Sequence, residues 1–204
     1  ASFLEYFSNR QHDKETINNV AFALEKIFHK NPSGADNSAS CFGGIIYFRK
    51  EFEFLKTISA LQCKIPQKIE NHLFLIDSGK PVESTKEMVE MVGKMYNKNS
   101  LFVESCFLQI EKCTKRMTVA LYKEDATFFK LALMENQKQL EKLGVVSVSA
   151  KKLLKSLSNL GVGKITGAGG IKKGSGYVVF YAENPTQFIL YAKKNKIPFI
   201  ALKQ

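Results

Sequence analysis

The pattern of apolar residues predicts a helix near the start of the chain, followed by a pair of strands. Between residues 17 and 28 the apolar positions recur at helical spacing and share one face, which we expect to pack on a core. Pro32 ends this pattern. After a glycine pair, residues 45–48 and 52–55 are rich in β-branched and aromatic side chains and predict a hairpin. The residues of the helical face are Ile17, Val20, Ala21, Leu24, Ile27 and Phe28.

A polar stretch around Pro66 separates this part from the rest, and we predict two domains, residues 1–64 and 65–204. Residues 72–77 then predict a buried strand. Ser84 and Glu87 have the spacing of a capping box, which marks the start of a helix. We expect the apolar stripe of that helix to lie in the core, with Met88, Val89, Met91, Val92 and Met95.

The remainder of the chain alternates long amphipathic segments with short apolar runs. This order predicts an α+β domain whose helices pack on one face of a mainly antiparallel sheet. The predicted helices are residues 100–121, 125–143, 149–160 and 185–194, and the predicted strands are residues 164–166, 177–181 and 198–202.

Composition and charge add little to this picture. Hydrophobic residues make up 45% of the 204 residues, which suffices for an ordinary core, and the net charge is +11. The lysines are scattered and do not form a block with interleaved aromatic side chains, as a groove for single-stranded nucleic acid would favour. We therefore favour a lysine-rich solvated surface over a nucleic-acid-binding module, which stays as an alternative.

The cysteines and the apolar runs indicate a cytoplasmic protein without a membrane partner. No pair of cysteines has the CxxC spacing of a zinc or redox site, so we expect buried thiols in a reducing cytosol. Cys106 and Cys113 fall on one helical face. No apolar run reaches the ~18 residues that span a bilayer, and no signal peptide opens the chain. The chain begins without methionine and already in a helical pattern, so we expect an upstream segment.

The first candidate for chemistry is Asp36, in the segment Asn-Pro-Ser-Gly-Ala-Asp-Asn at residues 31–37. Proline stiffens such a loop and glycine permits a tight turn, so a carboxylate there can be directed at a substrate hydroxyl as a general base. Capping of the next helix by Asp36 or Asn37 is the structural alternative. Gly43 and Gly44 fit either a close backbone approach to a ligand or a plain turn.

The second candidate is the glycine loop, residues 167–170, which follows a short predicted strand. Successive backbone N–H groups in such a loop can bind an anion, and small residues let a phosphate approach closely. Lys172 and Lys173 follow directly and could add positive charge near a polyphosphate. A purely structural turn is the alternative.

These landmarks resemble the mevalonate kinase family of the GHMP kinase superfamily, in order and over nearly the whole chain. The resemblance rests on the PSGxDN segment with its following Gly-Gly, the helix before it, and three later motifs. The later motifs lie at residues 76–86, at residues 134–144 and at residues 164–170.

The resemblance implies a fold, an activity and a set of site residues. Residues 1–64 would complete a ribosomal-protein-S5-like N-terminal domain, and residues 65–204 would form a ferredoxin-like C-terminal domain. Asp36 would be the catalytic carboxylate that faces the primary hydroxyl of mevalonate, with ATP and Mg²⁺ required and a homodimer possible. Ser33, Gly34, Asn37 and Ala168 would contact the substrate, and Gly167, Ala168, Gly169 and Gly170 the ATP phosphates.

The chain departs from the family pattern in two places. Residues 171–175 look like a short insertion after the third motif. The N-terminal lysine segment and the Gly-rich loop that cradles ATP phosphates and supplies a Mg²⁺-binding serine are absent, so no metal ligand is expected in this chain. We expect the chain to need the N-terminal part of the same kinase for turnover. Another GHMP kinase, for phosphomevalonate or a sugar, is the runner-up.

Overall fold

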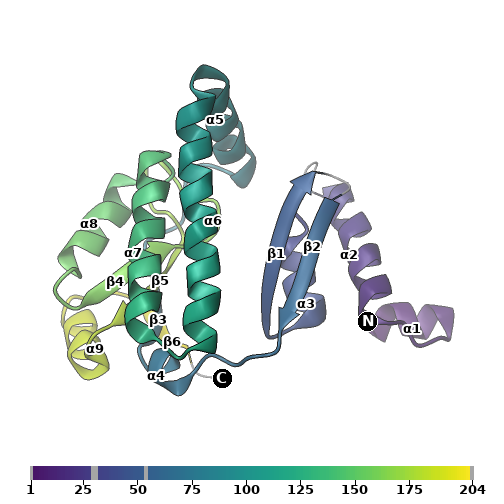
Figure 1. Cartoon of the computed structure of the whole chain (residues 1–204), viewed down its shortest axis with the longest axis horizontal. Coiled ribbons are helices and arrows are strands. Elements are labelled where there is room, and N and C mark those ends of the chain that lie inside the picture. Colours follow the sequence, from purple (N-terminus) through teal and green to yellow (C-terminus); the bar gives the residue numbers. More distant parts are fainter. Residues whose placement is uncertain (1, 29–31, 53–54, 203–204) are drawn as a thin grey trace. The chain divides into compact units, whose positions relative to one another are not determined.

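The computed structural model describes residues 2–28, 32–52 and 55–202, which divide into two compact units, Ala1–Lys64 and Ile65–Gln204 (Figure 1). Helices combine with antiparallel sheets in the chain, so the predicted α+β class is confirmed. The assignment of the two units to particular kinase domains stays a prediction.

The first unit consists of helices and an antiparallel hairpin. Its elements are α1 (Ser2–Ser8), α2 (Lys14–Phe28), α3 (Ala35–Phe42), β1 (Ile45–Phe52) and β2 (Leu55–Leu61). The predicted helix and hairpin are confirmed, but Phe52 belongs to the first strand and the second strand starts at Leu55. Glu53 and Phe54 of the predicted strand lie outside the described residues.

Helix α2 does not bury the apolar face that its sequence pattern marks. Leu24 is 53% exposed, Ile27 75% and Phe28 80%, whereas the buried residue of this helix is Asn18, at 6%. The reason is that α3 packs against α2 through a polar contact made by Asn18, so the described part of the unit leaves the apolar side uncovered. The expectation of a core-packed face is wrong within this unit.

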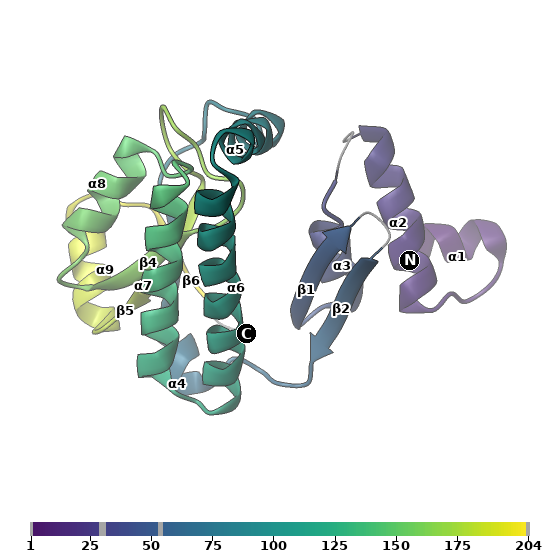
Figure 2. The same ribbon diagram turned by 45° about the horizontal axis from the view of Figure 1, so that its top comes forward.

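The second unit is built around a four-stranded antiparallel sheet with the order β4-β5-β3-β6. The long helices α6 and α7 run side by side in both views (Figures 1 and 2). The elements are α4 (Gln67–Glu70), β3 (Leu73–Asp77), α5 (Thr85–Lys98), α6 (Ser100–Tyr122), α7 (Ala126–Lys142), α8 (Val148–Ser156), β4 (Gly161–Ile165), β5 (Tyr177–Ala182), α9 (Pro185–Lys194) and β6 (Phe199–Ala201).

The core of this unit lies against one face of the sheet. Phe74 and Phe180 are paired across β3 and β5, as are Ile76 and Val178, and side chains of directly paired residues share a face. Phe188 of α9 packs on this face, with its ring centroid 4.6 Å from that of Phe74 and 5.0 Å from that of Phe180. The expected arrangement of helices on a mainly antiparallel sheet is thus confirmed.

Several predicted boundaries and burials in this unit need correction. Ser84 and Glu87 do form a capping box, and the expected core stripe is confirmed for four of its five residues. Met88 is buried, Met91, Val92 and Met95 are half-buried and pack against the core, and Val89 is 64% exposed. Helix α8 ends at Ser156, not at residue 160, and Gly161 begins β4 and does not close the helix. A side chain at Gly161 would meet the Tyr181 carbonyl oxygen at 2.0 Å, so close strand packing explains this glycine.

We predict that Phe188→Ala lowers the free energy of unfolding by about 3–5 kcal/mol, because it empties the centre of the aromatic core. Leu190→Ala on the same helix is the control, since Leu190 is 66% exposed, and it should change stability by less than about 0.5 kcal/mol. Urea denaturation of the whole chain measures both. Equal losses in the two variants would contradict this account of the core.

Candidate active site

The segment that contains Asp36 forms the start of helix α3. Gly34 is the N-cap residue, with a left-handed backbone (φ 87°), and the Ala35 N–H donates to Ser33 Oγ at 3.1 Å. Asp36 does not cap the helix, because no side chain accepts a hydrogen bond at this cap. Its exposed carboxylate lies in the first turn, where the helix dipole favours negative charge. Asn31 of the motif lies outside the described residues.

The carboxylate of Asp36 does not stabilise the described part of this unit through a hydrogen bond or an ion pair. Among the described residues, none donates a hydrogen bond to it or forms an ion pair with it, and the Ser40 hydroxyl contacts only the Asp36 main-chain oxygen, at 2.9 Å. A carboxylate that the fold does not use is available to a ligand. The capping alternative is therefore wrong, and the catalytic role of Asp36 stays a prediction.

Asn37 is oriented differently and fastens α3 to α2. Its Nδ2 donates to Asn18 Oδ1 at 2.6 Å and to the Asn18 carbonyl at 3.2 Å, and the Ser38 hydroxyl donates to the Gly34 carbonyl. The buried Asn37 Oδ1 has no partner among the described residues. The sequence interpretation missed Asn18, for which a polar residue beside an apolar helical face was the available signal.

A cavity of about 420 Å³ opens beside these residues within the first unit. Gly34 and Asn37 line it, whereas Ser33 and Asp36 are not among its lining residues. The structure thus brings two of the predicted substrate contacts to one cavity and leaves the other two residues of this segment outside it. The further lining residues are Glu15, Asn18, Asn19, Phe22, Ser38, Phe42 and Ile58.

The glycine loop belongs to the second unit and is fastened at both ends. The Thr166 N–H donates to the Tyr177 carbonyl at 2.8 Å, and the Gly170 N–H donates to the Val145 carbonyl at 3.0 Å. Between these anchors, the N–H groups of Gly167, Ala168 and Gly169 have no acceptor among the described residues. Consecutive free N–H groups in a glycine turn are a suitable site for an anion such as phosphate.

The glycines of this loop are needed for different reasons. At Gly169 (φ 81°) a Cβ atom would lie 2.0 Å from the Val145 carbonyl oxygen, and at Gly170 it would lie 2.5 Å from the Gly174 carbonyl oxygen. Gly167 (φ 64°) has open space around it, so its backbone conformation alone favours glycine. Close packing is enough to explain Gly169 and Gly170, as the alternative of a purely structural turn expects. That alternative gives no reason for the N–H groups without an acceptor.

Ala168 also borders an apolar hollow of about 240 Å³ in the second unit. In the strand before the glycine loop, the Lys164 ammonium donates to the Ile165 carbonyl at 2.7 Å, and burial lowers the pKa of this lysine. Lys172 and Lys173 are exposed. The other residues that line the hollow are Met88, Val89, Val92, Phe107 and Val145.

The two groups of candidate residues belong to different units, with Ser33, Gly34, Asp36 and Asn37 in the first and residues 167–170 in the second. Each unit therefore carries its own group of candidate residues. In residues 2–28, 32–52 and 55–202, no group of three or more His, Cys, Asp or Glu side chains could hold a metal ion. Within the same ranges, no helix has the length and apolar character needed to cross a membrane.

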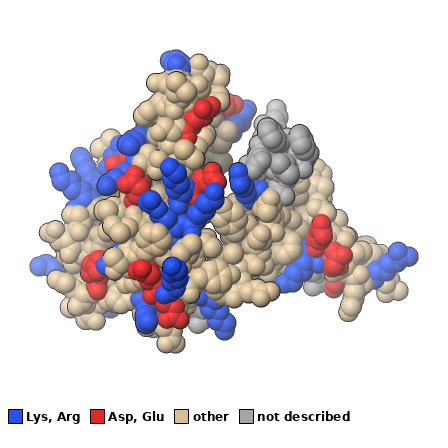
Figure 3. Space-filling model, in the orientation of Figure 1, with Lys and Arg blue, Asp and Glu red and all other residues tan. Residues whose placement is uncertain are grey.

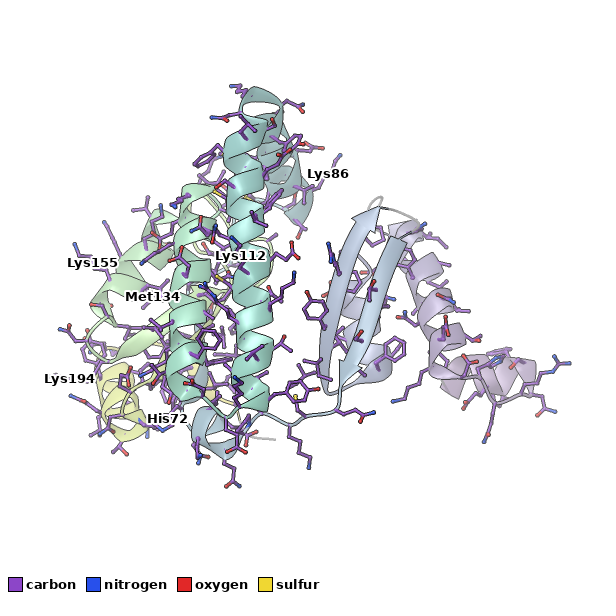
Figure 4. All side chains as sticks on the ribbon, in the orientation of Figure 1. His72, Lys86, Lys112, Met134, Lys155 and Lys194 are labelled. Atoms are coloured by element: carbon purple, nitrogen blue, oxygen red, sulfur yellow. The ribbon has the colours of Figure 1, made fainter. Side chains whose placement is uncertain are left out.

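Positive charge does not gather into a groove on the face that Figure 3 shows. Lys and Arg side chains are spread over it and alternate with Asp and Glu. Lys86, Lys112, Lys155 and Lys194 come from four different helices, α5, α6, α8 and α9, and lie well apart (Figure 4). This distribution fits the solvated lysine-rich surface better than a nucleic-acid-binding module.

Known proteins resemble the chain over most of its length. No protein-family model matches it. The mevalonate kinase of Schizosaccharomyces pombe is 32% identical over 166 residues, which are 75% of this chain and 40% of that protein. The mevalonate kinase of Mus musculus is 30% identical over 169 residues, which are 78% of this chain and 40% of that protein.

The fold is also found among solved structures. The crystal structure of L. major mevalonate kinase in complex with R-mevalonate matches 95% of this chain and 57% of that chain, with a TM-score of 0.73 and 22% identity. At this identity the likeness supports the fold alone. The chain spans about 40% of the length of the curated relatives it matches.

We predict that Gly169→Ala destabilises the second unit far more than Gly167→Ala does. The Gly167 variant should cost about 1–2 kcal/mol, the strain of a left-handed alanine. The Gly169 variant carries the same strain and also a clash with the Val145 carbonyl oxygen, which the backbone must move to relieve. Thermal unfolding and the amide NMR shifts of Val145 and Gly170 measure the difference. Similar effects of the two substitutions would show that the loop is not packed as described.

Proposed function

Because the chain belongs to the mevalonate kinase family, we propose that it is part of an enzyme that transfers the terminal phosphoryl group of ATP to the primary hydroxyl of mevalonate. The observation that carries the proposal is the Asp36 carboxylate, which lies exposed and unused by the fold inside the Pro-Ser-Gly-Ala-Asp-Asn segment. The activity is proposed for the whole kinase, since the chain spans about 40% of its relatives.

In this proposal Asp36 acts as the general base. Its carboxylate oxygen accepts the hydroxyl proton of the substrate while the substrate oxygen attacks the terminal phosphorus of ATP, and ADP leaves. Gly34 and Asn37, which line the neighbouring cavity, are the proposed substrate contacts from that cavity, and Ser33 and Ala168 complete the proposed set.

The glycine loop is the proposed contact for the ATP phosphates. The free N–H groups of Gly167, Ala168 and Gly169 support this role, because hydrogen bonds from fixed backbone donors stabilise charge that builds up during phosphoryl transfer. At Gly167 no described atom lies within 4 Å of the place a Cβ atom would take, so this side of the backbone is open to a phosphate oxygen.

Although no metal ligand was expected in this chain and the described residues hold no cluster of three ligating side chains, they offer two oxygen donors to a magnesium ion. Carboxylate oxygens are the ligands that Mg²⁺ prefers, and Glu25 on α2 has a buried Oε2 without a partner among the described residues. The Asp36 carboxylate is a second available oxygen donor. Mg²⁺ would neutralise charge on the phosphate oxygens, and Glu25 would supply one ligand toward it.

A partner segment is proposed for the first unit. The apolar face of α2, with Leu24, Ile27 and Phe28 between 53% and 80% exposed, is suited to packing against the N-terminal part of the same kinase. A segment packed on this face would complete the core that the helical pattern of residues 17–28 indicates. A cytoplasmic location and a homodimer remain part of the proposal.

We predict that Asp36→Asn lowers kcat of the whole kinase by about 10²–10⁴-fold with a small change in KM, because the amide cannot accept the substrate proton. The measurement is ADP release with mevalonate as substrate. Glu90→Gln, which removes an exposed carboxylate on α5, is the charge-matched control and should keep full activity. Full turnover by Asp36→Asn would remove Asp36 from the mechanism.

The substrate is tested separately with a panel. We expect the whole kinase to prefer mevalonate over phosphomevalonate and galactose in kcat/KM. A preference for either of the other compounds would keep the kinase assignment and replace the substrate with that of the runner-up.

A further inference from the structure

The insertion after the glycine loop is held by a carboxylate from a segment almost ninety positions earlier in the chain. Glu83 Oε2 accepts the Ile171 N–H at 3.1 Å, and Glu83 Oε1 accepts the Lys172 N–H at 3.1 Å. Each oxygen of one carboxylate thus binds one of two consecutive backbone donors. These donors would otherwise face solvent in an exposed loop.

A group of serine hydroxyls fixes the other end of the insertion. The Gly174 N–H donates to Ser149 Oγ at 2.9 Å, and the Ser175 N–H donates to Ser78 Oγ at 3.0 Å. The Ser175 hydroxyl, which is 1% exposed, donates to Ser147 Oγ at 3.1 Å. Residues 171–175 are therefore bound at both ends and do not form an open loop.

This bound insertion forms one wall of the glycine loop. A Cβ atom at Gly170 would lie 2.5 Å from the Gly174 carbonyl oxygen, 3.2 Å from Pro81 Cβ and 3.5 Å from Glu83 Oε2. On its other side, the Gly170 N–H donates to the Val145 carbonyl. The last residue of the glycine loop is thus enclosed between the Val145 segment and the segment that carries Glu83.

We propose that Glu83 is a positioning residue for the glycine loop: by fixing the backbone at Ile171 and Lys172, it holds Gly170 in place and keeps the N–H groups of Gly167, Ala168 and Gly169 arranged for phosphate. The identity of the ligand rests on the proposed function of this loop. The packing role of Glu83 rests on the contacts above and is independent of it.

The negative charge of Glu83 allows a positioning role to be distinguished from a purely electrostatic one. A carboxylate near a phosphate site repels the ligand, so its removal should tighten binding if charge were its only effect. Hydrogen bonds from the backbone N–H of Ile171 and Lys172, together with the positive charge of Lys172, lower the pKa of Glu83, which means that these donors favour the charged form. If Glu83 positions the loop, its removal should instead weaken binding.

The experiment uses the whole chain and inorganic pyrophosphate as the probe, with titration calorimetry. Glu83→Gln keeps the size of the side chain but has one acceptor oxygen in place of two, and we expect the dissociation constant to rise roughly tenfold, the loss of about one charge-assisted hydrogen bond. Glu90→Gln removes an equal charge from α5 and should leave binding unchanged or slightly tighter. Equal or tighter binding by Glu83→Gln would overturn the proposal.

Hydrogen exchange separates this proposal from the proposed function. We expect Glu83→Gln to reduce protection of the Gly170, Ile171 and Lys172 amides roughly tenfold, with no change in Glu90→Gln and partial recovery in Glu83→Asp. If the unmodified chain does not bind pyrophosphate, the phosphate role of the loop fails, and the exchange result alone decides the role of Glu83. Unchanged protection at Gly170 in Glu83→Gln would refute it.

Discussion

The pairing of β3 with β5 is the constraint on which the second unit depends. These strands are about a hundred residues apart in the chain, and their register runs from Leu73 opposite Tyr181 to Asp77 opposite Tyr177. Because β3 ends where β5 begins, the segment after Asp77 must emerge beside the segment before Tyr177. That single register brings Ser78, Gly79 and Glu83 next to the glycine loop and its insertion.

The first unit is organised by a polar contact more than by an apolar one. Asn18 and Asn37 join α2 to α3, and this contact turns the apolar side of α2 away from the unit. A hydrogen bond between a buried and a half-buried amide contributes little net free energy to folding. It requires a defined geometry, however, so it specifies how the two helices meet. The same contact sets the orientation of α3, at whose first turn the Asp36 carboxylate is exposed.

Local sequence rules identified those elements whose ends are set by local hydrogen bonds. The capping box of Ser84 and Glu87 and the helix of residues 185–194, which starts with proline after the N-cap Asn184, are examples. Glycine was harder to interpret, because Gly161 has the same local pattern as a helix stop but is required by the approach of the Tyr181 carbonyl oxygen from another strand. Periodicity likewise marks an apolar face without saying what covers it, as α2 and Val89 show.

The residues proposed for the site differ in how visible they are in the sequence. Asp36 stands out in the sequence because proline, glycine and a carboxylate lie within a few residues of one another. The glycine loop stands out because three of its four residues are glycine. Glu83 and Asn18 do not, since each acts through partners far away along the chain and has an ordinary local environment.

The close contact between Gly79 and Gly174 has a consequence for the exchange of loops between related enzymes. A Cβ atom at Gly174 would lie 2.1 Å from the Gly79 carbonyl oxygen, so a side chain at this position would force one of the two backbones to shift. Residues 171–175 transplanted alone into a homologous scaffold would therefore lose the partners that hold them here. The graft has to include Gly79, Glu83 and the serine hydroxyls together. A chimaera that omits them would lack the hydrogen-bond partners and the packing that hold the inserted residues.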